Sequence, residues 1–350
     1  MKAPEEITIH ELKEHEENKW NDVVNKSEDA WIYHRIEFRS INSAYNTKWK
    51  PYYFIALDRN EEIIGVFPTF LCGKRLYSLP MGACGPCCKD QVDKQAIRSV
   101  FMHHIDQFCR ERHVEAAYIE LPTLAPCYLP PNEREILWPT FFGYEEWKPH
   151  YTYIVNLESL DILWGKLEKR ARNAVRKASK SGLKLTMAQS LSDLKDYYLL
   201  HIQTYERTGA KPHPSEYFET IWKMLFPQNM AQIFFAEYNG KRIAAVFILM
   251  YKGAAIYNSG ASATEYLKYE PNAFLQWEVI KFLVQNKFKV YDLGGADPLS
   301  KDPKMQSLNM FKRQWGGVLV KGFKGWKEYS LKRKMLKKAF QARELVKRFF

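Results

Sequence analysis

One strand-and-helix pattern occurs twice in this chain, and this repetition constrains the fold more than any other feature. Each copy begins with two apolar, β-rich runs joined by a turn, at residues 53–57 and 63–70 in the first copy and at 232–238 and 242–249 in the second. The second turn contains Asn239-Gly240, and Asn-Gly is the strongest short-range signal for a β-hairpin. The repetition indicates a tandem duplication.

Each hairpin is followed by a helix and a short strand. In the first copy we expect a helix at 94–112 and a strand at 116–120, and in the second a strand at 254–258, a helix at 272–285 and a strand at 289–293. Two α/β units of similar order predict an α/β (α+β) chain with two tandem domains, each a mixed sheet flanked by helices. We place these domains at 1–150 and 151–326, followed by a basic amphipathic helix at 327–350.

Size and charge are consistent with a globular protein that has an anionic partner. A chain of 350 residues with 46% hydrophobic content can bury two cores of ordinary domain size. The formal net charge of +12 favours nucleic acid, a phosphorylated metabolite or an acidic membrane surface, and charge alone does not choose among them. Residues 1–15 have no apolar core, and no run of 18 apolar residues occurs, so we expect a cytoplasmic protein.

Three of the six cysteines lie within five residues, which raises the question of a metal or redox site. They are Cys84, Cys87 and Cys88. A structural zinc site needs a second ligand pair at regular spacing, and the sequence provides no clear one. A redox Cys-x-x-Cys motif usually opens a helix after a buried strand, whereas Pro86 places this motif in a loop. We therefore expect buried, reduced cysteines and no metal.

Residues 161–182 have the pattern of an amphipathic helix with one strongly basic face. The apolar positions recur every three or four residues, and Gly182 follows as a natural C-terminal cap. The opposite face carries seven cations, with Glu168 as the only acid between Lys166 and Lys184. A solvated surface helix is one interpretation. A charge distribution this one-sided favours an anion-binding face, with Arg172 and Arg176 as substrate contacts.

The C-terminal segment from Lys327 onward is a second basic amphipathic sequence. Its apolar positions include Leu331, Met335 and Phe340, and lysines and arginines fill the other positions. Such a helix could lie on an anionic bilayer with its apolar side in the headgroup boundary. It could equally dock its apolar stripe on the second domain.

Three segments in a fixed order resemble the FemAB-like transferases. They are residues 167–178 followed by Gly182-Leu183, residues 291–295 (Tyr-Asp-Leu-Gly-Gly), and residues 311–317 (Phe-Lys-Arg-Gln-Trp-Gly-Gly). These transferases belong to the superfamily of GCN5-related N-acyltransferases, and the likeness extends from about residue 31 to residue 326. The resemblance implies two tandem domains of the GCN5-related N-acyltransferase type.

The resemblance also implies an activity. Family members move an aminoacyl group from aminoacyl-tRNA to an amine on a peptidoglycan precursor, and distant relatives occur with exopolysaccharide biosynthesis. We therefore expect an N-acyltransferase that acts on a cell-envelope or polysaccharide precursor, with an anionic acceptor that is phosphorylated or lipid-linked. The expected donor is aminoacyl-tRNA, with no tightly bound cofactor. The expected location is cytoplasmic, at the inner face of the membrane if residues 327–350 bind anionic lipid.

The strand-to-helix junction of the second domain bears on the donor. Coenzyme A-dependent members of the superfamily normally have Gln/Arg-x-x-Gly-x-Gly/Ala there, whose backbone N–H groups hold the pyrophosphate. Residues 260–272 lack this pattern, and Gly82 and Gly85 in the first domain lack the leading Arg or Gln. This disfavours coenzyme A. Two alternatives stay open: an acyl-CoA-dependent N-acetyltransferase acting on an amino sugar, and a non-catalytic anion-binding protein.

The proposed catalytic residues are Lys312, Asp292 and Asp297. The resemblance implies that the basic residue at Lys312 faces the acceptor phosphates or the reacting carbonyl, where an ammonium group stabilises a tetrahedral intermediate. A surface lysine beside buried aromatic residues is the alternative. Asp292 and Asp297 flank Gly294-Gly295, where a carboxylate could orient the incoming amine or accept its proton, or could simply form the turn.

Five further residues complete the predicted site. Tyr205 and Arg207 end a helix that begins near Leu191, and the resemblance places them at the acceptor site. Arg207 could instead compensate the helix terminus. Arg313 follows Lys312 in the same motif. Tyr269 and Asn272 flank Pro271 at a helix N-terminus, which suits an anion or an oxyanion, or is an ordinary turn capped by Asn272. The sequence contains no Gly-x-Ser-x-Gly motif.

Overall fold

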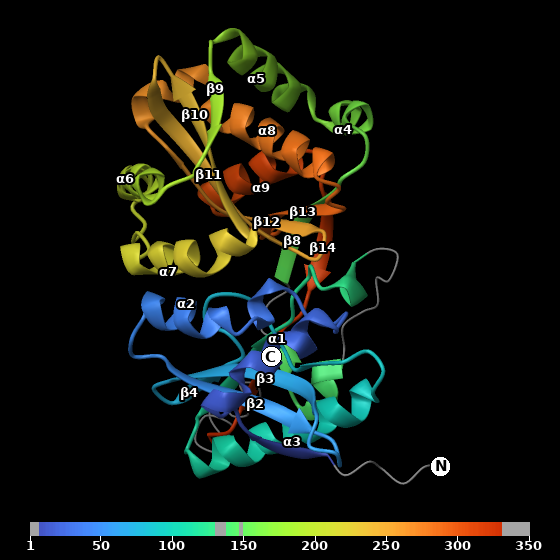
Figure 1. Ribbon diagram of the computed structural model, residues 1–350. Coiled ribbons are helices and arrows are strands. Elements are labelled where there is room, and N and C mark those ends of the chain that lie inside the picture. Colours follow the sequence, from blue (N-terminus) through green and yellow to red (C-terminus); the bar gives the residue numbers. More distant parts are fainter. Residues whose placement is uncertain (1–6, 130–137, 147–149, 331–350) are drawn as a thin grey trace, which may run out of the picture. The chain divides into compact units, whose positions relative to one another are not determined.

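The computed structural model describes residues 7–129, 138–146 and 150–330. The chain divides into two compact units, Met1–Pro149 with Gly322–Phe350, and His150–Lys321 (Figure 1). The first unit is therefore formed by residues from both before and after the second unit in the sequence. Among the described residues no helix is both long enough and apolar enough to span a bilayer.

The first unit is built on an eight-stranded sheet. Seven strands follow the order β1-β2-β3-β4-β6-β15-β7, and β5 pairs with β3. The strands are β1 (Thr8–Glu11), β2 (Lys50–Leu57), β3 (Ile63–Cys72), β4 (Arg75–Tyr77), β5 (Cys87–Cys88), β6 (Ala116–Glu120), β7 (Glu145–Glu146) and β15 (Lys324–Glu328), and the helices are α1 (Glu17–Asn25), α2 (Glu37–Tyr45) and α3 (Lys94–Glu111).

The second unit is built on a seven-stranded sheet in the order β14-β8-β13-β12-β11-β10-β9. Its strands are β8 (His150–Asn156), β9 (Lys184–Met187), β10 (Ala231–Tyr238), β11 (Lys241–Tyr251), β12 (Ala254–Ser262), β13 (Val290–Ala296) and β14 (Val318–Gly322). Its helices are α4 (Leu160–Lys166), α5 (Lys169–Lys180), α6 (Leu191–Thr208), α7 (Ser215–Leu225), α8 (Pro271–Gln285) and α9 (Pro303–Arg313).

The two sheets share one strand order. β1-β2-β3-β4-β6 in the first unit corresponds to β9-β10-β11-β12-β13 in the second. In both, the hairpin is antiparallel, while β4 with β6 and β12 with β13 are parallel pairs connected through α3 and α8. The predicted α/β chain with mixed sheets flanked by helices is confirmed, as is the duplicated pattern. The Asn239-Gly240 turn has positive φ at both residues, 49° and 77°, which is typical of a hairpin turn.

Helices cover both faces of each sheet, because the strands alternate between two apolar surfaces. In the first unit, Phe54 and Phe67 pack with Phe101 of α3, and Tyr53 on the opposite face packs against Trp20 of α1. In the second unit, α4, α5 and α8 share one core with the sheet. On the other face of that sheet, α6 packs against β11 and β12, and α7 packs against β10 and, through Phe218, against β11 (Figure 1).

The helix expected over 161–182 is two helices, so that expectation is wrong in one respect. The chain leaves the helical conformation at Leu167 and Glu168, where ψ is 140° and 152°. At this break the Glu168 N–H donates to the Gln314 carbonyl over 2.9 Å, and Leu167 is buried in the core. A hydrogen bond to a residue almost 150 positions away thus ends α4, and no local signal predicts it.

The first unit also departs from the predicted boundary at residue 326. Strand β15 pairs antiparallel with β6, with Lys324 opposite Glu120 and Glu328 opposite Ala116, so these residues complete the first sheet. Lys327 on this strand donates to both carboxylate oxygens of Asp106 in α3 at 2.7 Å. The predicted basic helix at 327–350 begins within β15, and from residue 331 on it lies outside the described residues.

The Asp193 carboxylate ties the N-terminus of helix α6 to the second sheet. Ser190 and Asp193 form a capping box, in which Asp193 accepts from the Ser190 N–H at 2.8 Å. The other oxygen of Asp193 lies 2.6 Å from Arg242 of β11. Burial by itself raises the pKa of Asp193, but hydrogen bonds from the Gln189 N–H, Arg242 and Ser190 outweigh it and lower the pKa to about 2. Deprotonated Asp193 therefore stabilises the fold.

Replacing Lys327 by Met tests how strongly β15 is anchored. We expect Lys327→Met to lower the free energy of unfolding by about 1–3 kcal/mol, because it leaves the half-buried Asp106 carboxylate without its cation. Lys324→Met is the matched control, since Lys324 pairs with Glu120 at 2.6 Å from a more exposed position, and its cost should stay below about 1 kcal/mol. Urea unfolding measures both. Equal costs would contradict the anchoring role of Lys327.

Asp193→Asn should destabilise the protein in a pH-dependent way. The pKa of Asp193 is lower in the folded state than its ordinary value of 3.8, so its contribution is complete above pH 4 and is lost as the pH falls toward 2. We expect a loss of about 2 kcal/mol at pH 7 that shrinks below pH 4. Asp196→Asn is the control, because Asp196 also binds Arg242 but is more exposed. A cost that does not change with pH would contradict this assignment.

Candidate active site

Strands β12 and β13 part after a short parallel stretch. They pair only from Ala254–Ile256 with Val290–Asp292, although β12 continues to Ser262 and β13 to Ala296. Two irregularities in strand pairing accompany the separation. One lies in the pairing of β11 with β12, and the other lies in the pairing of β13 with β8, between Asp292 and Gly295. We call the residues where these strands part, Tyr257, Asp292, Gly294, Gly295 and Lys312, the β12–β13 fork.

Asp292 is the buried carboxylate of the fork. Its side chain is 2% exposed, and Oδ1 accepts from the Thr152 hydroxyl and from the Gly294 N–H, the latter at 2.7 Å. Burial raises the pKa of Asp292, while Thr152, the Gly294 N–H and the positive charge of Lys312 oppose the increase. These contacts orient the carboxylate and hold the Gly294-Gly295 turn in position.

Lys312 reaches the same turn from the end of α9. Its Nζ donates to the Gly295 carbonyl at 2.5 Å. Gly294 has a φ of 86°, and a Cβ at this position would lie 3.4 Å from Lys312 Nζ and 3.9 Å from the Tyr257 carbonyl. Burial lowers the pKa of Lys312, and the negative charge of Asp292 partly restores it. A partly desolvated ammonium is thus held at the point where the strands separate.

The structure brings Lys312 and Asp292 together as predicted site residues, and it adds two that the sequence did not indicate. Thr152 lies 140 positions from Asp292 and approaches it only because β8 pairs with β13. Tyr257 lies over Gly260, where a Cβ would come within 1.7 Å of the Tyr257 hydroxyl. Asp297 lies beyond the fork, is exposed, and is connected to Asn309 through its backbone.

The predicted arginines form local contacts elsewhere in the second unit. Arg207 donates to the Ser262 carbonyl and to the Thr264 hydroxyl, both at 2.9 Å, so it joins the end of α6 to the end of β12. Arg313 pairs with Glu168 at 2.9 Å. Substrate binding by these residues stays a prediction.

Arg172 and Arg176 both lie beside the break between α4 and α5. Arg172 donates to carbonyls at the C-terminus of α4, including Gly165 at 3.2 Å. The Arg176 guanidinium lies 5.5 Å from the ring centroid of Trp164. The substrate-binding role predicted for this pair likewise remains a prediction.

The remaining candidates lie on three different elements, Tyr205 on α6, Tyr269 on the turn after β12 and Asn272 on α8. The Tyr205 hydroxyl is 3.1 Å from Nε2 of His213, and Tyr269 stacks on Tyr238 with centroids 4.5 Å apart. Asn272 is in the first turn of α8 rather than at its cap, because Glu270 precedes the helix with a φ of 58°. The alternative in which Asn272 caps the helix is therefore wrong.

The junction between β12 and α8 does not have the form of a pyrophosphate site. Residues Thr264–Tyr269 form a 3-10 turn, η6, and Glu270 places a carboxylate at the helix N-terminus, where it pairs with Lys177 at 3.4 Å. Residues 264–270 contain no glycine, so no position in this segment gives a phosphate close access to the backbone N–H groups. An acidic side chain here would repel a pyrophosphate. The residues present therefore do not fit coenzyme A bound in this way.

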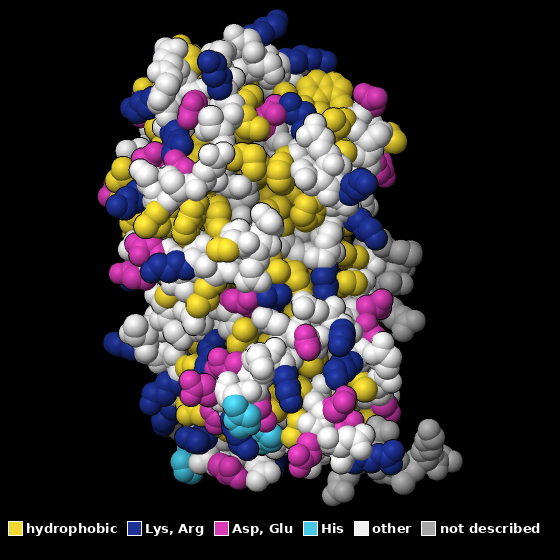
Figure 2. Space-filling view, viewed as in Figure 1, with side chains coloured by type: hydrophobic (Ala, Val, Ile, Leu, Met, Phe, Trp, Pro, Cys, Tyr) yellow, Lys and Arg dark blue, Asp and Glu magenta, His cyan; other side chains and the backbone are white. Residues whose placement is uncertain are grey.

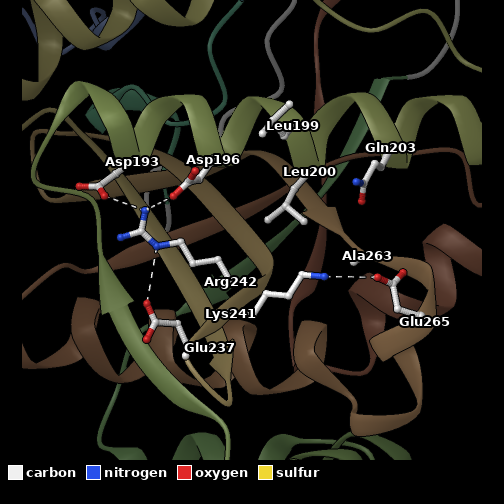
Figure 3. Close-up of a pocket in the computed structure, with 11 residues that line it drawn as sticks. Asp193, Asp196, Leu199, Leu200, Gln203, Glu237, Lys241, Arg242, Ala263 and Glu265 are labelled. Carbon is white, nitrogen blue, oxygen red and sulfur yellow. Dashed lines mark hydrogen bonds and ion pairs between the residues drawn. The ribbon is translucent and has the colours of Figure 1, made fainter.

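A polar pocket of about 560 Å³ lies beside the fork strands but does not contain Lys312 or Asp292. Figure 3 shows Arg242 pointing between Asp193, Asp196 and Glu237, and Lys241 pointing toward Glu265. Because the cations of this pocket are already paired with carboxylates, the pocket is better suited to holding α6 against the β10–β11 hairpin than to binding an anion.

The cysteines lack the arrangement of a reactive or metal-binding site. Cys84, Cys87 and Cys88 are buried, and none forms a disulfide. Burial raises the pKa of Cys88, with a further contribution from Asp29, to about 12, which keeps it as a thiol. Within the described part of the chain, no group of three His, Cys, Asp or Glu side chains is placed to bind a metal ion.

The comparisons with known proteins agree with the fold. Residues 165–303 match the family described as Acetyltransferase (GNAT) domain. The crystal structure of FemX superposes with a TM-score of 0.72 at 16% identity, covering 94% of this chain and 99% of that one. A tandem GNAT protein from the clavulanic acid biosynthesis pathway superposes with a TM-score of 0.57 at 10% identity, covering 92% and 98%.

Two curated relatives align with parts of the chain. A UDP-N-acetylmuramoylpentapeptide-lysine N(6)-alanyltransferase of Weissella viridescens is 27% identical over 143 residues, 41% of each protein. A lipid II:glycine glycyltransferase of Staphylococcus haemolyticus is 34% identical over 82 residues, 23% of this chain and 20% of that protein. The alignments thus span less than half the length of these relatives. Residues 165–303 therefore match a GNAT domain, the fold is that of FemX, and parts of the chain are similar in sequence to these two aminoacyltransferases.

Proposed function

We propose that this protein is an aminoacyltransferase that moves an aminoacyl group from aminoacyl-tRNA to an amine of a cell-envelope precursor. The observation that carries the proposal is Lys312, a partly desolvated ammonium held at the β12–β13 fork beside the buried Asp292. The two curated relatives named above support the reaction class, since their names describe transfer of alanine to a muramoylpentapeptide lysine and of glycine to lipid II.

The reaction requires positioning and charge stabilisation rather than an enzyme nucleophile. The neutral acceptor amine attacks the ester carbonyl carbon, and the carbonyl oxygen becomes negatively charged. The ammonium of Lys312 stabilises this oxyanion. When the intermediate collapses, the bond from carbon to the ribose oxygen breaks, the amide forms, and the proton lost by the amine balances the charge on the departing ribose oxygen.

The surroundings of Lys312 suit this role. Its Nζ is held by the Gly295 carbonyl at 2.5 Å, so the ammonium is positioned before substrate binds. Asp292 acts through Lys312 and through the turn, because its Oδ1 already accepts from Thr152 and from the Gly294 N–H. We therefore assign Lys312 as the catalytic group and Asp292 as a positioning residue.

The form of the β12–α8 junction supports the proposed donor. A 3-10 turn and the Glu270 carboxylate occupy the place where a coenzyme A pyrophosphate would lie. An aminoacyl ester carried by tRNA does not need a pyrophosphate site at that junction. The acceptor is expected to be anionic, in agreement with the net charge of +12, and to be phosphorylated or linked to a lipid.

Lys312→Ala should lower kcat about 100- to 1,000-fold without unfolding the protein, because it removes the group that stabilises the oxyanion. The assay follows radiolabelled alanine or glycine from charged tRNA to UDP-N-acetylmuramoylpentapeptide or to lipid II. Lys304→Ala is the control, since Lys304 is exposed on the same helix. Circular dichroism checks the fold of both variants. Full activity of Lys312→Ala would overturn the proposed role.

The same assay distinguishes the alternative donor. If no aminoacyl group is transferred from tRNA to either acceptor, and acetyl-CoA raises the melting temperature in a saturable way, the proposal is wrong and an acyl-CoA-dependent enzyme takes its place.

The pH profile provides a second test of Lys312. Burial holds the pKa of Lys312 below its ordinary value of 10.5, and only the protonated form stabilises an oxyanion. We expect kcat to fall as the pH rises through a value below 10.5. In Lys312→Arg the guanidinium stays charged, so the residual activity should lose this decline. An unchanged alkaline limb in Lys312→Arg would show that another group titrates.

A further inference from the structure

Three tyrosines gather where the β10–β11 hairpin meets η6. Tyr238 is the last residue of β10, and Tyr266 and Tyr269 lie in η6. The Tyr238 and Tyr269 rings stack with centroids 4.5 Å apart at 25°, and Tyr266 lies 6.2 and 6.4 Å from them. All three side chains are half-exposed. Aromatic rings that stack at the surface, rather than in the core, provide a platform for a flat ligand.

Two lysines lie over the rings of this platform. Lys268 Nζ is 5.1 Å from the Tyr269 ring centroid, and Lys241 Nζ is 5.1 Å from that of Tyr266. An exposed cation–π contact changes a binding constant by about two- to fivefold, whereas stacking of a nucleobase changes it by about five- to 150-fold. A base can therefore displace a lysine from the ring.

Helix α5 brings a positive surface to the same place. Its exposed cations are Lys169, Arg170, Arg176, Lys177 and Lys180. Lys177 lies 3.4 Å from Glu270, the residue directly after Tyr269, so the helix and the tyrosines are neighbours. The helix has 12 residues and is therefore roughly 18 Å long, enough to follow several phosphates. Figure 2 shows Lys and Arg side chains along the upper end of the view, where Figure 1 places α5.

The composition of this surface distinguishes RNA from a lipid bilayer. A helix that binds a membrane surface inserts large apolar side chains beside its cations. Of the large apolar residues that are exposed in the described part of the chain, none lies on α5, whose exposed positions are lysine, arginine, asparagine and serine, and one, Leu267, lies on η6. Cations on a polar helix beside stacked aromatic rings are the combination that binds phosphates and unpaired bases.

We propose that α5 and the tyrosines of η6 and β10, together the α5–η6 face, bind the single-stranded end of an RNA and the duplex next to it. The cations of α5 contact the phosphates, and Tyr238, Tyr266 and Tyr269 stack on the unpaired bases. This inference rests on the proposed function, for which it identifies the surface that holds the tRNA acceptor end.

The test compares two RNA hairpins by fluorescence anisotropy at about 150 mM salt, one with an unpaired 3′ extension and one with a blunt end. The wild-type protein should bind the extended RNA at least about fivefold more tightly. Tyr238→Ala/Tyr269→Ala should abolish this preference and leave the salt dependence unchanged. Tyr238→Phe/Tyr269→Phe should retain the preference, because phenylalanine keeps the ring.

A second variant pair tests the phosphate contacts. Lys169→Ala/Lys180→Ala should weaken binding of both RNAs alike and reduce the slope of log K against log salt by about two. The control, Lys195→Ala/Lys223→Ala, removes the same charge from α6 and α7 and should leave both affinities unchanged. Equal effects of the two pairs would overturn the inference, because binding would then depend on net charge alone.

Other outcomes separate this inference from the proposed function. Suppose that the wild-type protein transfers an aminoacyl group from tRNA, and that the tyrosine variants show the same transfer activity and the same preference for the extended RNA. In that case the α5–η6 face is not the RNA site, and the proposed function stands. If the wild-type protein prefers the extended RNA through these residues but transfers nothing, the inference stands and the function fails. Binding of α5 to phosphatidylglycerol vesicles without any RNA preference would overturn the inference.

Discussion

The early separation of β12 and β13 is the constraint on which the candidate site depends. The two strands pair over three residues, and beyond Asp292 the backbone of β13 is paired only with β8, with an irregularity between Asp292 and Gly295. One buried carboxylate holds the backbone at this irregularity, because Asp292 accepts from Thr152 and from the Gly294 N–H. A buried carboxylate is stable only when such donors surround it. The geometry that opens the sheet therefore also positions the Gly295 carbonyl that binds Lys312.

The chain builds the same sheet twice, but it completes the two copies differently. The strand beside β13 is β8, which precedes the rest of its unit, whereas the strand beside β6 is β15, which comes about 200 residues later. In each copy, an antiparallel strand thus pairs with the outer side of β6 or β13. This pairing satisfies backbone groups that would otherwise lie at an open edge of the sheet. Folding of the first unit consequently requires a segment that follows the second unit.

Much of the fold could be predicted because its signals are local. The hairpins follow from β-rich runs around turn residues, and α3 and α8 lie within one residue of the ranges expected for them. The break at Leu167 and the return of β15 could not be predicted. Helix periodicity continues across Leu167, and only the Gln314 carbonyl, distant in sequence, explains why the helix ends. Likewise, a strand of five residues carries no information about which sheet it joins.

The sequence by itself determined the residue types of the site, the two-unit order and the turns. Asp292 and the Gly294-Gly295 pair are recognisable because a charge and glycines lie at the end of a strand, and Lys312 because its motif at 311–317 resembles that of the FemAB-like transferases. Only the tertiary structure decided which of these groups meet. Thr152 reaches Asp292 through strand pairing, and the sequence did not predict that Arg172 binds the end of α4, that Arg207 binds the end of β12 or that Arg313 pairs with Glu168. The sequence specifies which side chains are present at the site, whereas the contacts that position these side chains arise when strands distant in the sequence pair with each other.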